Sequence, residues 1–254
     1  MNDNIITSTQ NEIFKHISKL YLAKHRKVMG EFVLEGERLV NDAHKNNADI
    51  NFLVVCESYN GKFPEGVKTY TFSNKLFNEL KDTVNSQGIL AVAKMNKKES
   101  FDFESARTIV YLDLVCDPGN MGTIIRTCDA AGVDAVVLSK GCVDIYNPKV
   151  VRSTMSSLFN VNIINDDNTL LKLKDMNFSL IGTYLGAKKS VYDIDFSKKS
   201  VIIIGNEANG ISDEVITLCD EKIIIPMVGK CESLNAAISC GICVYEALRQ
   251  KLNK

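Results

Sequence analysis

The second half of the chain alternates strongly apolar segments with helical ones, and this alternation restricts the fold more than any other feature. The apolar segments are short and nearly continuous, as in strands that a parallel sheet buries on both faces. They are Thr108 to Val115, Ala135 to Leu138, Val161 to Ile164, Phe178 to Leu185, Ser200 to Gly205 and Lys222 to Ile225. Helical segments separate them, at Met121 to Ala131, Lys149 to Leu158, Leu170 to Met176, Asp213 to Cys219 and Ser233 to about Leu252. This pattern predicts an α/β fold, an open parallel sheet with helices on both faces.

The first part of the chain predicts a smaller α/β domain. Helices are expected over Asn11 to Leu22, Glu35 to Asn46 and Asn74 to Leu80. Strands are expected over Phe32 to Leu34, Asn51 to Cys56, Val67 to Tyr70 and Gly88 to Ala93. The polar stretch from Lys94 to Glu104 lacks periodicity, which is typical of a linker. We therefore expect a small domain over residues 1–97, a linker over 98–107 and a larger domain over 108–254.

Composition is that of an ordinary globular protein, and we expect a cytoplasmic location. Its 254 residues are 45% hydrophobic and 24% charged, as is usual for soluble domains. No apolar run reaches the roughly 18 residues that span a bilayer, and the polar start Met1 to Gln10 does not resemble a signal peptide. The eight cysteines lie singly in apolar segments, which is typical of reduced core residues. Cys240 and Cys243 have a ligand-like spacing, but no second pair or nearby histidine completes a metal site.

Basic residues gather near the N-terminus, although the net charge of the chain is only −1. The stretch from Ile13 to Gly30 contains no acidic residue and carries five cations, Lys15, Lys19, Lys24, Arg26 and Lys27. Such a run is compatible with a solvated helix face or with a stripe that binds phosphates. Charge alone leaves both interpretations open.

Three segments that follow predicted strands carry polar residues suited to chemistry. The first runs from Asp117 to Arg126 and reads DPGNMGTIIR. It leaves a strand through a Pro-Gly turn and enters a helix. Asn120 could be a helix cap or a functional amide, and Arg126 a surface residue or a functional cation.

The second segment, Gly205 to Ile211, reads GNEANGI and follows a very apolar strand. Two glycines around a loop allow a backbone to approach a ligand closely. The spacing is that of a phosphate-binding loop, but Ile211 replaces the required lysine, and a GxGxxG fingerprint is also absent. Glu207 could be a helix-capping acid or an active-site carboxylate.

The third segment, Ile225 to Asn235, reads IPMVGKCESLN. Pro226 ends the preceding strand because proline cannot donate to a sheet ladder. Ser233 is expected to cap the long final helix. Ligands of open α/β sheets bind where the strands end, so the three segments could converge on one pocket for a small polar ligand.

Together these segments closely resemble the three motifs of the SpoU (TrmH-like) family of RNA ribose 2′-O-methyltransferases, within the SPOUT superfamily. The resemblance covers Thr108 to about Leu252 and includes the stretch Asp144 to Ser153. In the first domain, Phe32 to Arg38 and Gln87 to Val92 are similar to the family's substrate-binding domain. One departure lies at Thr154 and Ser156, where relatives usually carry Ala and Gly.

The resemblance implies a trefoil knot in the second domain, S-adenosylmethionine as methyl donor, no metal, and a homodimer formed through the knotted domain. The implied activity is methylation of a ribose 2′-hydroxyl in RNA, with ribosomal RNA as the expected substrate. A tRNA substrate is the alternative, and a non-catalytic RNA-binding protein with the same fold is a further one. That last protein would lack Asn120, Arg126 or Glu207, and all three are present.

The resemblance also implies roles for individual residues. The catalytic residues would be Asn120, Arg126, Glu207, Ser233 and Asn235. The cofactor-binding residues would be Thr183, Tyr184, Leu185, Gly205, Asn206, Ile225, Met227, Ser233 and Leu234. The RNA-binding residues would be Lys15, Lys19, Lys24, Arg26, Lys27, Arg38, Lys149 and Arg152.

Proton removal is the open point of the chemistry, because the three histidines, His16, His25 and His44, all lie in the first domain. The family resemblance assigns activation of the acceptor to Arg126. An arginine is hard to deprotonate, so anchoring a phosphate and stabilising the developing alkoxide suit Arg126 better than the role of a base.

Overall fold

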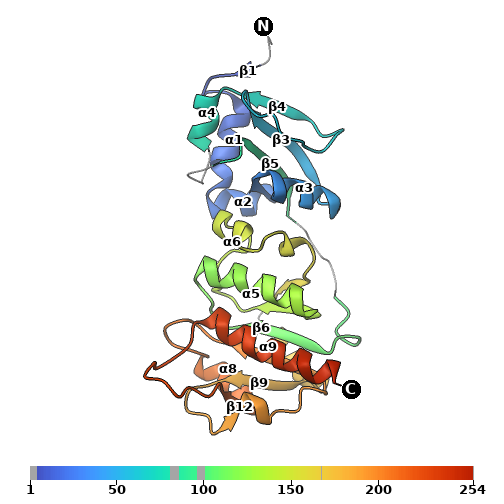
Figure 1. Cartoon of the computed structure of the whole chain (residues 1–254), viewed down its shortest axis with the longest axis vertical. Helices are drawn as coiled ribbons and strands as arrows, with labels where there is room; N and C mark the ends of the chain where they lie inside the picture. The colour runs from blue at the N-terminus through green and yellow to red at the C-terminus, as the bar shows by residue number, and fades with distance from the viewer. Residues whose placement is uncertain (1–4, 81–85, 96–100, 167, 254) are drawn as a thin grey trace. The chain divides into compact units, whose positions relative to one another are not determined.

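The computed structural model describes residues 5–80, 86–95, 101–166 and 168–253 (Figure 1). The chain divides into two compact units. The first unit comprises Met1–Lys97 and Asp144–Phe159, and the second comprises Lys98–Val143 and Asn160–Lys254. Residues 98–100 of the predicted linker lie outside the described residues.

The first unit is built on a five-stranded mixed sheet with the order β1-β4-β3-β5-β2. Its strands are β1 (Ile5–Ile6), β2 (Glu31–Glu35), β3 (Ile50–Cys56), β4 (Thr69–Phe72) and β5 (Ile89–Lys94). Its helices are α1 (Glu12–Leu20), α2 (Ala23–Met29), α3 (Glu37–Lys45), α4 (Asn74–Leu80), α6 (Pro148–Ser153) and the 3₁₀ helix η1 (Ser157–Phe159). Strand β5 pairs antiparallel with both β2 and β3, whereas β4 pairs parallel with β1 and β3. The predicted elements are present, and β1 and α2 are additional.

The basic stretch of the first unit is divided between two helices. Helix α1 ends at Leu20, and α2 begins after Leu22, whose backbone is extended. Gly30 ends α2 in the left-handed conformation, with φ of +67°, which glycine adopts at little cost. The break places Arg26 on the inner side of α2, where its side chain is only 2% exposed.

The segment Asp144–Phe159 packs within the first unit through Arg26. The guanidinium donates from Nη2 to Asp144 Oδ2 at 2.6 Å and from Nε to the same oxygen at 3.0 Å. Its Nη1 donates to the carbonyls of Leu20 and Tyr21. A buried guanidinium needs partners for all its donors, so this ion pair anchors the segment beside α2.

The single helix predicted over Lys149 to Leu158 is interrupted in the structure. Helix α6 ends at Ser153, and η1 begins only at Ser157. Between them Met155 and Ser156 have positive φ, +48° and +77°. Ser156 Oγ donates to Asp42 Oδ2 at 2.9 Å. The turn thus uses two residues in the left-handed region, a conformation that interrupts a right-handed helix.

The second unit is a seven-stranded parallel sheet with the order β10-β12-β9-β11-β6-β7-β8. Its strands are β6 (Thr108–Leu112), β7 (Ala135–Leu138), β8 (Ile163–Asn165), β9 (Ser179–Thr183), β10 (Lys189–Ser190), β11 (Ser200–Ile204) and β12 (Glu221–Ile224). Its helices are α5 (Pro118–Ala131), α7 (Thr169–Asp175), α8 (Asp213–Leu218), α9 (Ala236–Leu252) and the 3₁₀ helix η2 (Val191–Asp193). The six predicted strands are present, and β10 is an additional edge strand.

Helices cover both faces of this sheet, which confirms the predicted α/β fold. On one face Leu173 of α7 and Val215 of α8 pack in a core with Ile109 and Ile203. On the other face lie α5 and α9, which pack against each other, and α9 also packs on β11 (Figure 1). Strand residues such as Ile202 are fully buried, because both faces of the sheet are covered.

The final helix starts two residues later than predicted. Asn235, not Ser233, is its N-cap, and the Asn235 side chain accepts from the amides of Ala237 and Ile238. The expectation that Ser233 caps the helix is therefore wrong. An asparagine amide oxygen is at least as good a cap acceptor as a serine hydroxyl, and here it lies directly before the first helical residue.

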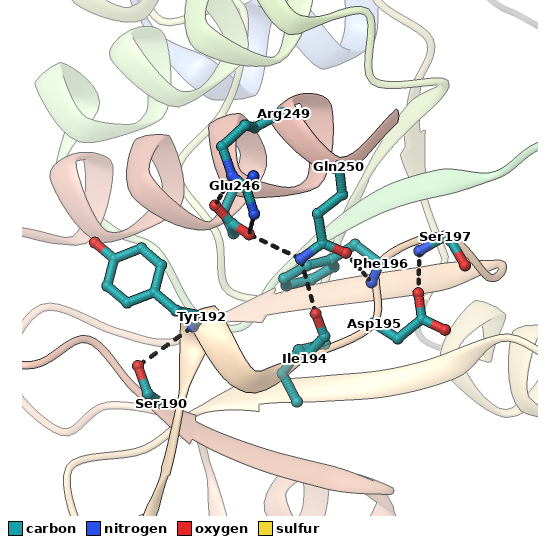
Figure 2. A network of polar contacts seen from close by, with 9 residues as sticks. All are labelled: Ser190, Tyr192, Ile194, Asp195, Phe196, Ser197, Glu246, Arg249 and Gln250. Carbon is teal, nitrogen blue, oxygen red and sulfur yellow. Dashed lines mark hydrogen bonds and ion pairs between the residues drawn. The ribbon is translucent and has the colours of Figure 1, made fainter. Parts of the chain in front are cut away.

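The C-terminal end of α9 is fastened to the segment that follows β10 (Figure 2). Gln250 donates from Nε2 to the carbonyl of Ile194 at 2.8 Å and accepts from the amide of Phe196 at 2.9 Å. Glu246, a buried carboxylate, accepts from both Arg249 and Gln250. These hydrogen bonds attach α9 to the residues that follow β10, the edge strand next to β12.

Candidate active site

A cavity of about 260 Å³ lies at the C-terminal ends of β9, β11 and β12. It is lined by residues 183–185, 204–211, 223–225, 227, 233–234, 236 and 239. All three strands are parallel, so their carboxyl ends meet at one edge of the sheet, as expected for a ligand site of an open α/β fold. The lining combines apolar side chains with the amide and carboxylate groups of the loop after β11.

The loop after β11 closes on itself at its two glycines. Asn206 and Gly210 exchange backbone hydrogen bonds of 2.8 and 2.9 Å. A Cβ built on Gly205 would lie 2.1 Å from the carbonyl carbon of Gly210, so no other residue fits at this position. Gly205 is thus required by the backbone of its own loop, and it also lines the cavity.

Glu207 is held at the rim of the cavity by groups from the turn after β6. Its carboxylate accepts from the backbone amides of Cys116 at 3.3 Å and Asp117 at 3.2 Å. It also accepts from Asn120 Nδ2 at 2.9 Å. Glu207 therefore links the second motif to the first by hydrogen bonds. It does not cap α8, whose N-cap is Ser212.

These contacts keep Glu207 ionised at neutral pH. Partial burial raises the pKa of the Glu207 carboxyl, but the hydrogen bonds from Asn120 and from the backbone amides of Asp117 and Cys116 outweigh it. The net pKa of Glu207 lies below its ordinary value. Hydrogen bonds to the charged form always favour that form. The site thus presents a fixed negative charge.

Asn120 connects Glu207 to the third motif. While its Nδ2 donates to Glu207, its Oδ1 accepts from Asn235 Nδ2 at 2.8 Å. Asn120 is buried on the inner side of α5, and Asp117, not Asn120, caps that helix. The three predicted motifs therefore meet in one chain of hydrogen bonds, Glu207–Asn120–Asn235.

Arg126 does not join this chain. It lies six residues after Asn120 on α5, which rotates it by about two thirds of a turn, and its side chain is exposed. Within the part of the chain that the structure describes, the Arg126 side chain makes no hydrogen bond or ion pair. Ser233 is exposed as well and lines the cavity. Their catalytic roles stay predictions.

Every residue predicted to bind the cofactor lies in the wall of the cavity. These residues are Thr183, Tyr184, Leu185, Gly205, Asn206, Ile225, Met227, Ser233 and Leu234. The Thr183 hydroxyl donates to the carbonyl of Ile203 at 3.0 Å, which fixes its rotamer. The structure thus gathers this set in space, and its binding function stays a prediction.

The residues predicted to bind RNA fall into two groups. Lys15, Lys19, Lys24, Lys27 and Lys149 are exposed. Arg38 is exposed too and lies 3.6 Å from Asp42. By contrast, the buried Arg26 is bound to Asp144, and Arg152 is half-buried in a depression that also contains Tyr21 and Glu35.

The prediction for Arg26 is corrected by these contacts. Its charge is compensated by Asp144, and its donors face protein carbonyls, so the guanidinium cannot reach a phosphate without breaking the anchor of the segment 144–159.

Sequence reasoning missed Asp113 and the backbone amides of the turn after β6. Asp113 is 3% exposed, and its Oδ2 accepts from the amide of Ser212 at 2.7 Å. The signal was available, because a carboxylate at the end of an apolar strand must find donors when it is buried. The amides of Cys116 and Asp117 carry no signal of their own in the sequence.

The described residues contain no group of three or more His, Cys, Asp or Glu side chains placed to hold a metal ion. The helices among them are all too short or too polar to cross a bilayer.

Comparison with known proteins agrees with this site. The profile of the SpoU rRNA Methylase family matches residues 107–245, and that of the MRM3-like substrate binding domain matches residues 11–91. The 23S rRNA (guanosine(2553)-2′-O)-methyltransferase RlmP of Bacillus subtilis (strain 168) is 33% identical over 244 residues, 94% of this chain and 97% of that relative.

Two further proteins bear on the substrate. A solved structure of an AdoMet bound rRNA methyltransferase from Sinorhizobium meliloti has a TM-score of 0.85 and 31% identity, covering 96% of this chain and 97% of that one. The tRNA (guanosine(18)-2′-O)-methyltransferase of Aquifex aeolicus (strain VF5) is 35% identical over 150 residues, 58% of this chain and 71% of the relative.

The fold and the site are those of an α/β methyltransferase with its ligand cavity at the strand ends. The chain belongs to the SpoU rRNA methylase family. This confirms the family resemblance that the three motifs predicted.

Proposed function

We propose that this protein is an S-adenosylmethionine-dependent methyltransferase that modifies a ribose 2′-hydroxyl of RNA, with ribosomal RNA as substrate. The observation that carries the proposal is the chain Glu207–Asn120–Asn235 at the rim of the cavity. It joins the three family motifs at one point, next to the loops that would hold the methyl donor. The names of the relatives RlmP and the Sinorhizobium meliloti rRNA methyltransferase support the ribosomal substrate.

The cavity fits the proposed donor. Leu185, Ile225 and Leu234 offer apolar surface for an adenine ring, and all three line the cavity. The negative charge of Glu207 at the rim complements a sulfonium cation. Gly205 lines the cavity, so its main chain can contact a ligand there. When bound, S-adenosylmethionine supplies an activated methyl group that needs no metal.

The protein's own residues would position the acceptor and compensate charge. Asn120 and Asn235 orient the Glu207 carboxylate, because each amide uses its donor and its acceptor in the network. Arg126 is exposed and unpaired within the described residues, so its guanidinium is available to an RNA phosphate or to the developing alkoxide. The role of Ser233 would be to contact the ribose from the cavity wall.

A homodimer through the second unit is part of the proposal. Helix α9 exposes Ile238, Tyr245 and Leu252, with exposed fractions of 53%, 50% and 75%. They recur every seven residues, so they lie on one side of the helix. An apolar stripe of this kind is suited to packing against a second copy. Light scattering should give a dimer mass for the native chain and a monomer mass for Tyr245→Asp.

The finer parts of the proposal follow from the family. We place a trefoil knot in the second unit, as the similarity in fold to the Sinorhizobium meliloti enzyme supports. We place the protein in the cytoplasm, where ribosomal RNA is found. The exposed lysines of α1 and α2, Lys15, Lys19, Lys24 and Lys27, would contact RNA phosphates. A tRNA substrate is the second candidate, because the relative from Aquifex aeolicus is named as a tRNA methyltransferase.

The deciding experiment is transfer of a labelled methyl group from S-adenosylmethionine to RNA. Ribosomal RNA and tRNA should be prepared from cells that lack this protein, and the modified nucleotide mapped. We expect label on a ribose of ribosomal RNA with the native chain and none with Arg126→Ala, while donor affinity in calorimetry stays unchanged. Label on tRNA alone would favour the second candidate. Donor binding without label on either RNA would support a non-catalytic RNA-binding protein.

A further inference from the structure

Leu114 has an unusual backbone conformation in the turn after β6. Its φ is +56°, in the left-handed region where a side chain is disfavoured and glycine is preferred. Its side chain is nevertheless large, apolar and 39% exposed. Strained residues persist where their surroundings fix them, and they concentrate at functional sites. Leu114 thus combines backbone strain with an exposed apolar side chain.

Four contacts hold Leu114 in this conformation. Its amide donates to Ser139 Oγ at 2.9 Å. Its carbonyl accepts from Asn206 Nδ2 at 2.8 Å and from Cys116 Sγ at 3.2 Å. Its side chain packs on Gly141, since a Cβ built on that glycine would lie 2.7 Å from Leu114 Cδ2. Gly141 has a positive φ of its own, +99°. Leu114 is therefore fixed on its backbone and supported on one side of its side chain.

The turn that carries Leu114 borders the active site. Residues 113–117 contact the loop that carries Glu207 at both of its ends. Asp113 accepts from the amide of Ser212, directly after the loop, and the amides of Cys116 and Asp117 donate to Glu207. Asn206, the partner of the Leu114 carbonyl, lines the donor cavity. Leu114 itself is absent from the cavity wall. It lies beside the site that binds the donor and outside it.

We propose that the Leu114 side chain contacts the base of the nucleotide whose ribose is methylated. This inference rests on the proposed function, because it assigns a contact to the acceptor of that reaction. A leucine side chain forms no hydrogen bonds, so it would hold the face of a base by van der Waals contact and not by reading its edge. The hydrogen bonds of its backbone keep the side chain in place before RNA arrives, which reduces the entropy lost on binding.

The test uses Leu114→Gly, a substitution that removes the side chain and relieves the strain together. The variant should keep the native fold, since glycine accepts this φ. We expect unchanged affinity for S-adenosylmethionine in calorimetry and a kcat/KM for ribosomal RNA lower by about tenfold, the usual scale for lost apolar contacts in a substrate site. Leu114→Met should restore most of the activity, since it keeps apolar volume.

The matched control is Asn177→Gly. Asn177 also has a left-handed backbone, with φ of +61°, in an exposed turn after α7, and this variant should keep native kcat/KM. If Leu114→Gly methylates ribosomal RNA with native kcat/KM, the proposed contact is wrong. If the native chain itself transfers no methyl group to RNA, the proposed function fails instead, and this inference fails with it.

Discussion

Asn235 Nδ2 donates to Asn120 Oδ1 at 2.8 Å, while Asn235 Oδ1 caps the last helix by accepting from the amides of Ala237 and Ile238. One side chain therefore starts α9 and orients an amide of the active site. The link joins residues 115 positions apart in the sequence. The start of α9 in the third motif therefore fixes the orientation of the Asn120 amide in the first motif.

The two roles of Asn235 can be separated by substitution. Asn235→Asp keeps a good cap acceptor but has no donor for Asn120, so we expect stability near native and strongly reduced methyl transfer. Asn235→Ala should lose both, with a stability cost of about 1 kcal/mol for the missing cap. Thermal unfolding and methyl transfer to ribosomal RNA measure the two effects. Native activity in Asn235→Asp would show that the contact with Asn120 is not required.

Glu207 should stabilise the fold in a pH-dependent way. Its pKa in the folded chain is lowered, so its contribution is fully present above the unfolded value of about 4.3. The contribution is lost as pH falls through the folded pKa, because protonation then removes the charge that the hydrogen bonds favour. The difference in melting temperature between the native chain and Glu207→Gln should be constant between about pH 6 and 8 and shrink below about pH 4. A difference that grows on acidification would contradict the assignment.

Gly205 should tolerate no larger residue. In Gly205→Ala the new methyl group would lie 2.1 Å from backbone atoms of the same loop, so the loop must open and Glu207 must move. We expect loss of S-adenosylmethionine binding in calorimetry together with a lower melting temperature. Gly229→Ala is the control, because a Cβ there meets no atom within 4 Å. That variant should bind the donor with native affinity.

The cations of α2 should differ in what they do. Arg26→Met leaves Asp144 without its partner and should destabilise the chain by about 3 kcal/mol, the usual scale for breaking a buried pair. Lys24→Glu with Lys27→Glu changes two exposed side chains, so stability should stay near native while affinity for ribosomal RNA falls and depends less on salt. Denaturant unfolding and filter binding over a range of salt distinguish the two classes. Equal destabilisation by both variants would contradict this division.

Local pattern was enough to predict most of the elements and the family. The apolar runs at β6, β7 and β11 are short and nearly continuous, and strands buried on both faces look like this in any sequence. The breaks at Pro226 and around Gly205 place the loops directly after strands. Because parallel strands end at one edge, the convergence of the three motifs could be expected from strand order. The individual residues of the cavity wall followed from the family resemblance.

Contacts between distant residues decided the rest. Whether Arg26 faces RNA or Asp144 depends on a partner 118 positions away, and a charge pattern along one helix contains no information about that partner. The division of α1 from α2, the cap of α9 at Asn235 and the strained turn at Leu114 were likewise not predicted. The contacts Arg26–Asp144, Asn235–Asn120 and Leu114–Asn206 form only when separate segments meet. The periodicity of any one segment contains no information about them.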